Sequence, residues 1–146
     1  MLKYQLPIIQ NIRAIKSSEE IGYITRAQKI SEKTLDLVLK KLKIGITEIE
    51  LARQVVAEYK NLGIKTLAFE PIVAFGKGTA DIHHIPSSVR LKMGDTVMLD
   101  FGCTVNGYCS DMTRTYFLGK PSTRQQQVYL AVLEAQERAL KLLTKG

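Results

Sequence analysis

The stretch LDFGCTVNGYCSDMTRT, residues 99–115, predicts a β-hairpin that carries two acidic side chains. Asn106 and Gly107 tolerate the positive φ angles that both central positions of a type I′ turn require, and this dipeptide is the strongest short-range hairpin signal. Side chains alternate between the faces of a strand, and directly paired residues share a face. Counting outward from the turn therefore places Asp100 and Asp111 on one face as diagonal neighbours.

The other face of the first strand is expected to be buried. It presents an apolar row suited to packing under helices, formed by Val97, Leu99, Phe101, Cys103 and Val105. The same count places Gly102 opposite Asp111. It also places Cys103 and Cys109 on opposite faces of the hairpin, which argues against a disulfide between them.

A pair of carboxylates on one face needs a physical explanation. Two unit charges about 4 Å apart repel by roughly 4 kcal/mol at an effective dielectric constant near 20. A partly buried pair therefore needs a cation, a shared proton or wide spacing, and a divalent ion held by oxygen ligands is the simplest relief. The alternative is that this face is wet and that both acids are ordinary surface residues.

Capping boxes, in which the side chains of the N-cap and third helical residues bond back to the backbone, mark the starts of three helices. They open helices to about residues 42, 62 and 143, and are Ser17-x-x-Glu20, Thr47-x-x-Glu50 and Ser122-x-x-Gln125. A short buried strand is expected at residues 71–75. The order helix, helix, strand, loop, hairpin, helix indicates the α+β class, with helices packed on one face of an antiparallel sheet.

Length and composition favour one globular domain over residues 1–146, with residues 1–16 as a lead-in segment. A chain of 146 residues that is 45% hydrophobic has enough apolar content for a core. No stretch approaches the length of a membrane span and no signal-peptide core is present, so we expect a cytoplasmic protein with reduced thiols and no membrane contact. The net charge of +7 is spread along the predicted helices without interleaved aromatic residues, which favours solvated helix faces over nucleic-acid binding.

Both histidines of the chain stand together in IHHIP, residues 82–86. This loop lies where the chain returns toward the acidic face of the predicted hairpin. A neutral imidazole there could donate a hydrogen bond to a developing oxyanion or accept a proton, although a loop histidine is more often structural or merely exposed.

Taken together, these segments resemble a known family. The series FEPIVAFG, IHHIP, MGDTVMLDFG and GYCSDMTRTYFLG is similar to the catalytic domain of the Xaa-Pro aminopeptidase and prolidase group, within the methionine aminopeptidase and creatinase superfamily. The likeness runs from about residue 12 to the last helix and implies the first half of a pita-bread fold. By this resemblance Asp100 and Asp111 are two ligands of a dinuclear metal centre, with Asp111 bridging the ions. His83 is the histidine that contacts substrate or stabilises the tetrahedral intermediate.

The resemblance also implies a reaction and a cofactor. It implies metal-dependent hydrolysis of N-terminal Xaa-Pro bonds in peptide substrates, with manganese as the expected ion and cobalt or zinc as alternatives. Gly102 is then expected to leave space beside the ions. Gly78 and Ile82 stand where the family commonly has Asn and Pro, and this departure bears on the rim of the substrate pocket.

The family's remaining metal ligands, one His and two Glu, come from a second half that this sequence does not resemble. We therefore expect the chain alone to be inactive or nearly so, and to present an exposed apolar surface to a second-half polypeptide or to another copy of itself. Two alternatives are a metal-free binding module of the same fold and another hydrolase of the fold, of the methionine aminopeptidase or creatinase type. The three residues Asp100, Asp111 and His83 together argue against the binding module.

Overall fold

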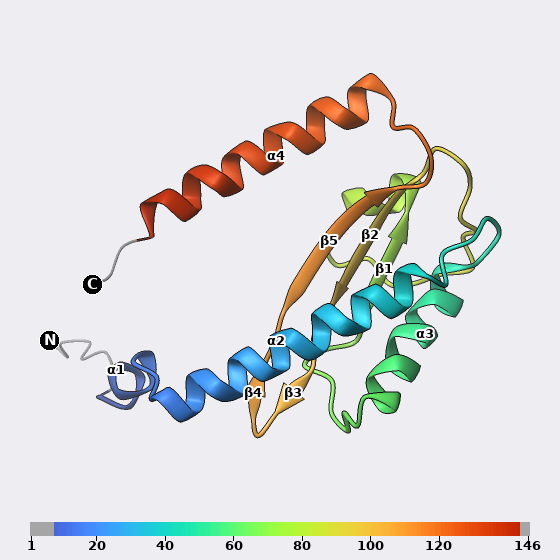
Figure 1. Cartoon of the computed structure of the whole chain (residues 1–146). Helices are drawn as coiled ribbons and strands as arrows, with labels where there is room; N and C mark the ends of the chain where they lie inside the picture. The colour runs from blue at the N-terminus through green and yellow to red at the C-terminus, as the bar shows by residue number, and fades with distance from the viewer. Residues whose placement is uncertain (1–7, 144–146) are drawn as a thin grey trace, which may run out of the picture. The chain divides into compact units, whose positions relative to one another are not determined.

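The computed structural model describes residues 8–143 and has an α+β architecture (Figure 1). Its elements are, in chain order, α1 (Ile8–Ala14), α2 (Ser18–Leu39), α3 (Glu48–Asn61), β1 (Ile72–Phe75), the 3-10 helix η1 (Gly76–Ala80), β2 (Thr96–Phe101), β3 (Thr104–Val105), β4 (Tyr108–Cys109), β5 (Met112–Phe117) and α4 (Thr123–Leu142). β1, β2 and β5 form a three-stranded sheet in the order β1-β2-β5, and β3 pairs with β4 in a separate hairpin. The predicted fold class, an antiparallel sheet with packed helices, is confirmed.

The predicted capping boxes are all present. Ser17 Oγ accepts a hydrogen bond from Glu20 N while a Glu20 carboxylate oxygen accepts one from Ser17 N, and the same reciprocal pair forms at the starts of α3 and α4. α3 and α4 end within one residue of the predicted positions, whereas α2 stops at Leu39 rather than near residue 42. α1 lies in the segment that was expected to be a lead-in, of which residues 1–7 fall outside the described part of the chain.

The turn of the hairpin is as predicted. Asn106 and Gly107 have φ angles of 48° and 83°, and Val105 pairs with Tyr108 in an antiparallel register. Cys103 is buried and Cys109 is exposed, as the alternation requires, and both are free thiols. The sequence therefore fixes both the turn and the side on which each cysteine lies.

The ladder is interrupted beyond the Cys103–Ser110 pair, because β3 and β4 form a sheet separate from that of β2 and β5. Ser110 N donates to the Cys103 carbonyl at 2.9 Å, and Ser110 Oγ accepts from Cys103 N at 3.0 Å. A Cβ added to Gly102 would lie 1.9 Å from the Ser110 carbonyl oxygen. The expectation that Gly102 leaves space beside bound ions is therefore wrong, because the Ser110 backbone fills that space.

The chain divides into two compact units, each built from three separate segments. The first unit contains residues 8–41, 54–71 and 100–112, and the second contains residues 42–53, 72–99 and 113–143. The prediction of a single domain stays a prediction. Within residues 8–143 no helix has the length and apolarity that crossing a membrane requires.

In the first unit, α2 packs on the β3-β4 hairpin. The rings of Tyr59 and Phe101 meet edge to face, with 5.9 Å between their centroids. Beside them Ser31 Oγ lies 2.7 Å from both Tyr59 Oη and Ser110 Oγ, so a buried chain of hydroxyls joins α2, α3 and the segment after β4. Burial raises the pKa of Tyr59 far above its ordinary value, and its hydroxyl stays protonated.

In the second unit, the start of α3 and the sheet strands share a core. Its fully or almost fully buried side chains are Leu51, Val73, Ala74, Leu91, Val97 and Leu99. α4 is tied to this unit by Gln125 Nε2, which donates to Gly94 O and Thr96 Oγ1 at 3.0 Å, and by an edge-to-face contact between Phe117 and Tyr129. No side chain of α4 is buried.

Candidate active site

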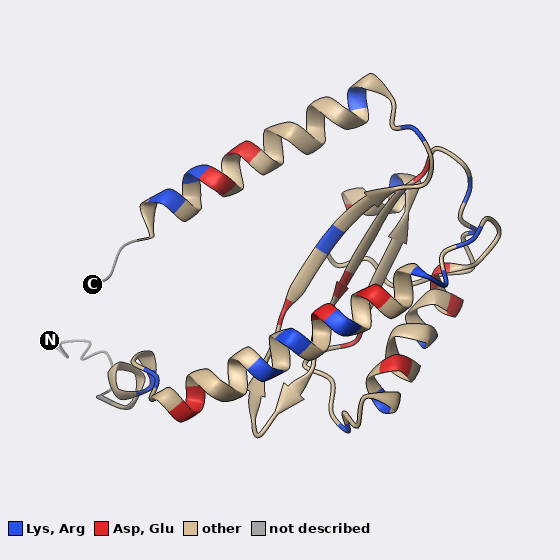
Figure 2. Ribbon diagram, viewed as in Figure 1, with Lys and Arg blue, Asp and Glu red and all other residues tan. Residues whose placement is uncertain are grey.

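The two predicted metal ligands stand at the ends of neighbouring strands. Asp100 is the penultimate residue of β2, and Asp111 immediately precedes β5. β2 and β5 are hydrogen-bonded neighbours that run in opposite directions (Figure 1). The end of β2 therefore lies beside the start of β5, where Figure 2 shows acidic positions. Both residues belong to the first compact unit.

Burial shows on which side these carboxylates lie. Leu99 and Phe101 are completely buried, whereas Asp100 between them is half-buried, with its Oδ1 atom shielded from solvent. Asp111 is exposed, and the buried Met112 beside it lies against Gln28 of α2. Since successive side chains of a strand alternate, both acids project from the side away from α2. The predicted buried row is confirmed, and the acids lie opposite it.

These side chains fit part of a site for a hard divalent cation. Carboxylate oxygens are suitable ligands for manganese or magnesium, which are commonly coordinated by about six oxygen ligands. Among residues 8–143 no three His, Cys, Asp or Glu side chains are grouped so that they could enclose a metal ion. The ten remaining residues contain none of these types. The chain thus offers a carboxylate pair without the further side chains that a closed site needs.

The two histidines have different environments. His84 Nε2 lies 2.8 Å from Oε2 of Glu48, a carboxylate with no exposed surface. His83 is exposed, and its imidazole has no hydrogen-bond partner in the described part of the chain. Its backbone N donates to Asp81 Oδ1 at 2.9 Å. His83 is therefore the histidine whose ring is available to a substrate, while His84 is held by the protein.

Sequence reasoning missed Glu48. Besides His84, this carboxylate accepts hydrogen bonds from Phe75 N at 2.8 Å and from Ser87 N and Oγ at 2.9 and 2.7 Å. Burial by itself raises the pKa of Glu48, but the hydrogen bonds from His84, Ser87 and Phe75 outweigh burial and hold that pKa below its ordinary value. The available signal was a second acid in the first turn of α3, where the capping box uses only Glu50.

The structure thus brings the predicted residues together in two groups. Asp100 and Asp111 lie in the first unit, and His83 lies in the second with His84 and Glu48. The roles of the three predicted residues stay predictions.

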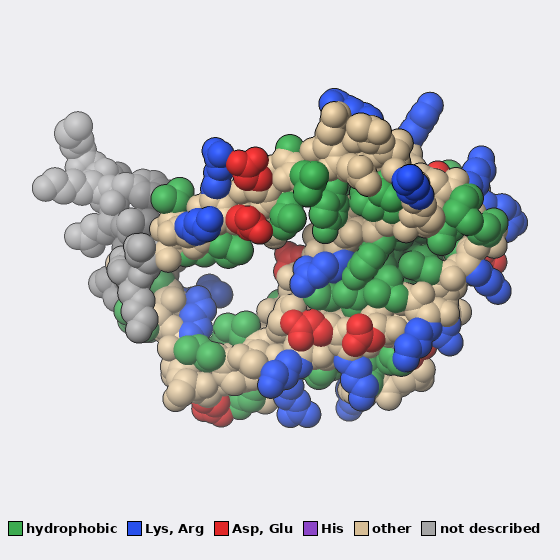
Figure 3. Space-filling model, turned by 45° about the horizontal axis from the view of Figure 1, so that its top comes forward, with side chains coloured by type: hydrophobic (Ala, Val, Ile, Leu, Met, Phe, Trp, Pro, Cys, Tyr) green, Lys and Arg blue, Asp and Glu red, His purple; other side chains and the backbone are tan. Residues whose placement is uncertain are grey.

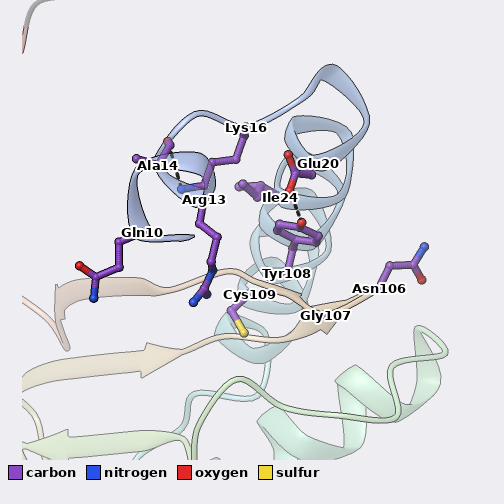
Figure 4. Close-up of a pocket in the computed structure, with 10 residues that line it drawn as sticks. All are labelled: Gln10, Arg13, Ala14, Lys16, Glu20, Ile24, Asn106, Gly107, Tyr108 and Cys109. Carbon is purple, nitrogen blue, oxygen red and sulfur yellow. Dashed lines mark hydrogen bonds between the residues drawn. The ribbon is translucent and has the colours of Figure 1, made fainter. Parts of the chain in front are cut away.

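A cavity of about 700 Å³ lies elsewhere in the first unit, between α1, the start of α2 and the hairpin turn (Figure 4). Tyr108 donates to a Glu20 carboxylate oxygen there, and this bond raises the pKa of Tyr108 and lowers that of Glu20. None of the predicted metal ligands or histidines lines this cavity. It is therefore separate from the candidate active site.

Comparison with known proteins places the chain in a family. Residues 22–146 match the model of metallopeptidase family M24. The X-Pro aminopeptidase of Thermotoga maritima superposes with a TM-score of 0.90 at 36% identity, covering 94% of this chain and 39% of that one. The prolidase of Pyrococcus furiosus superposes with a TM-score of 0.86 at 38% identity, covering 90% of this chain and 39% of that one.

A curated relative gives the same picture from sequence. An uncharacterized peptidase of Staphylococcus aureus is 36% identical over 138 residues, which are 94% of this chain and 39% of the relative. The chain thus spans about two-fifths of the length of the proteins that it matches. The match over residues 22–146 includes both candidate carboxylates and the histidine loop. The chain belongs to metallopeptidase family M24.

Proposed function

We propose that this chain supplies the first part of the active site of an M24 metallopeptidase that acts on N-terminal Xaa-Pro bonds. The observation that carries this proposal is the carboxylate pair, Asp100 and Asp111, at the adjoining ends of β2 and β5 on the side away from the core. The similarity to an X-Pro aminopeptidase and a prolidase supports the choice of substrate.

Each residue has a chemical task in this proposal. Asp100 and Asp111 hold divalent ions, with manganese favoured by hard oxygen ligands and cobalt or zinc as alternatives. When bound, such ions lower the pKa of a water molecule and polarise the scissile carbonyl. The exposed imidazole of His83 donates a hydrogen bond to the substrate or holds a proton at a ring nitrogen.

The rest of the site is proposed to come from a second-half polypeptide or from another copy of the chain. Two carboxylates supply only part of the coordination that manganese takes, so the chain alone binds the ion weakly and hydrolyses peptides poorly or not at all. α4 carries exposed apolar side chains (Figure 3), among them Leu130 and Val132, which are 60% and 64% exposed. Such side chains support the proposal that a partner covers this helix.

Paramagnetic broadening tests the carboxylate pair even if binding is weak. Millimolar Mn²⁺ added to the ¹⁵N-labelled chain should broaden amide signals around residues 100 and 111 first. Asp100→Asn and Asp111→Asn should each remove this effect, whereas Asp36→Asn, at an exposed position of α2, should leave it unchanged. Broadening centred elsewhere, or unaffected by both variants, would overturn the metal site.

Calorimetry and peptide hydrolysis test whether the chain is incomplete. We expect millimolar or weaker manganese binding and no cleavage of Xaa-Pro peptides. Micromolar binding lost in both variants, with an oligomer in the same buffer, would show that a second copy completes the site. Cleavage by the monomeric chain that is lost in Asp111→Asn would refute the incompleteness of the site.

A further inference from the structure

We propose that Glu48 is a positioning residue for His83, acting through a hydrogen-bonded clamp in which the buried Glu48 carboxylate holds the partly buried His84 and Ser87. The proposal rests on the proposed role of His83 at the substrate. The clamp lies entirely within the second compact unit and joins the first turn of α3 to the loop that carries both histidines.

Every hydrogen bond of the clamp converges on one carboxylate. Glu48 Oε2 accepts from His84 Nε2 at 2.8 Å, from Ser87 N at 2.9 Å and from Ser87 Oγ at 2.7 Å. Glu48 Oε1 accepts from Phe75 N at 2.8 Å, which connects the clamp to the end of β1. A buried carboxylate is tolerated only when such donors replace water, so the loop and the helix hold one another in place.

The charge state of Glu48 determines the tautomer of His84. An ionised carboxylate can only accept hydrogen bonds, so Nε2 of His84 carries the hydrogen in this contact. His84 is thereby kept as a donor toward the interior through Nε2. The two adjacent histidines have separate tasks, His84 as an anchor and His83 as the exposed group.

Gly78 makes room for this anchor. A Cβ added at residue 78 would lie 3.1 Å from Cε1 of His84 and 3.4 Å from both ring nitrogens. These distances are tight, so a larger side chain at residue 78 would press on the imidazole that contacts Glu48. Gly78 and His84 thus fit one another.

Hydrogen bonds on both sides of His83 hold its backbone in place. On one side its own backbone N donates to Asp81 Oδ1 at 2.9 Å, and on the other His84 and Ser87 are held by Glu48. These hydrogen bonds fix the backbone of His83 and leave its imidazole exposed. Glu48 therefore sets the direction in which His83 is presented without touching substrate.

NMR of the chain tests the proposal with Glu48→Gln, which keeps the size of the side chain but removes its charge and one acceptor. We expect amide hydrogen exchange at His83, His84 and Ser87 to rise at least tenfold relative to β2. We also expect the His83 ring signals to shift or broaden. Arg53→Gln, which removes a charge from an exposed position of the same helix, is the control and should leave both readouts unchanged.

A second variant covers the case in which Glu48→Gln does not fold. His84→Asn removes one bond of the clamp and should still loosen residues 83–87 and change the His83 ring signals. Unchanged His83 signals in a folded variant, or exchange that rises equally in β2, would show that Glu48 supports only the fold. Manganese broadening near residues 100 and 111 separately tests the proposed function, so its absence would overturn that function without altering the result at the loop.

Discussion

At the scale of single residues, position 102 requires glycine because the Ser110 backbone lies against it. We predict that Gly102→Ala lowers the free energy of unfolding by about 3 kcal/mol or more, because its methyl group must displace the Ser110 backbone. Urea unfolding measures this loss. Gly22→Ala is the control, since nothing lies within 4 Å of a Cβ at that helical position and alanine there should stabilise by about 0.5–1 kcal/mol. A Gly102→Ala protein as stable as the parent would contradict the close approach.

Glu48 makes the stability of the folded chain depend on pH. Because its pKa is lower in the folded chain than in the unfolded one, its stabilising contribution is present above the ordinary glutamate pKa of about 4.3 and is lost as the pH falls through the folded value. Glu48→Gln should therefore be less stable at neutral pH and should lose less further stability on acidification. Thermal unfolding from neutral to acidic pH measures both curves. Parallel curves would contradict this assignment, since Glu20 and Glu50 titrate in both proteins.

At the scale of elements, the buried hydroxyl chain ties α2 and α3 to the segment after β4. We predict that Tyr59→Phe lowers the free energy of unfolding by about 1 kcal/mol, because Ser31 keeps Ser110 but loses its bond to the phenol. Chemical unfolding checks the value. Tyr23→Phe, which loses a solvent-facing bond to Glu19, should change stability much less. Equal losses in the two variants would show that burial of the hydroxyls does not increase their contribution to the free energy of unfolding.

The elements also show how far local sequence determines the fold. Helix starts are correctly predicted because a capping box is satisfied within four consecutive residues, and the buried row of β2 follows from strict alternation. The end of α2 depends on packing and has no comparable signal. α1 has no acid in its first turn, and the side chains described for it are exposed, so no pattern marks it.

The candidate site was predictable to a similar extent. Asp100 and Asp111 lie opposite the buried residues Leu99, Phe101 and Met112, as strand alternation predicts. The break at Gly102 could not be foreseen, since counting from the turn assumes an unbroken ladder. Glu48 could not be foreseen either, because its donors come from residues 75, 84 and 87, which are distant in sequence.

At the scale of the whole molecule, the exposed apolar side chains predict association. We expect the chain to sediment as a dimer or larger species, or to bind a second-half polypeptide. Val128→Gln with Val132→Gln should weaken that association, because these residues lie one turn apart on α4 and are 48% and 64% exposed. Sedimentation velocity at several concentrations is the measurement. Gln127→Asn is the control on the same helix, and a monodisperse parent monomer that binds no partner would contradict the prediction.

The interleaving of the two compact units has a consequence during synthesis on the ribosome. The face of α2 that packs on the hairpin is complete at Leu39, but the hairpin that covers it ends at Cys109. At a translation rate of about 5–20 residues per second, that face waits several seconds for its partner strands. The first unit is therefore complete only after residue 112 has been synthesised, although its first segment ends at residue 41.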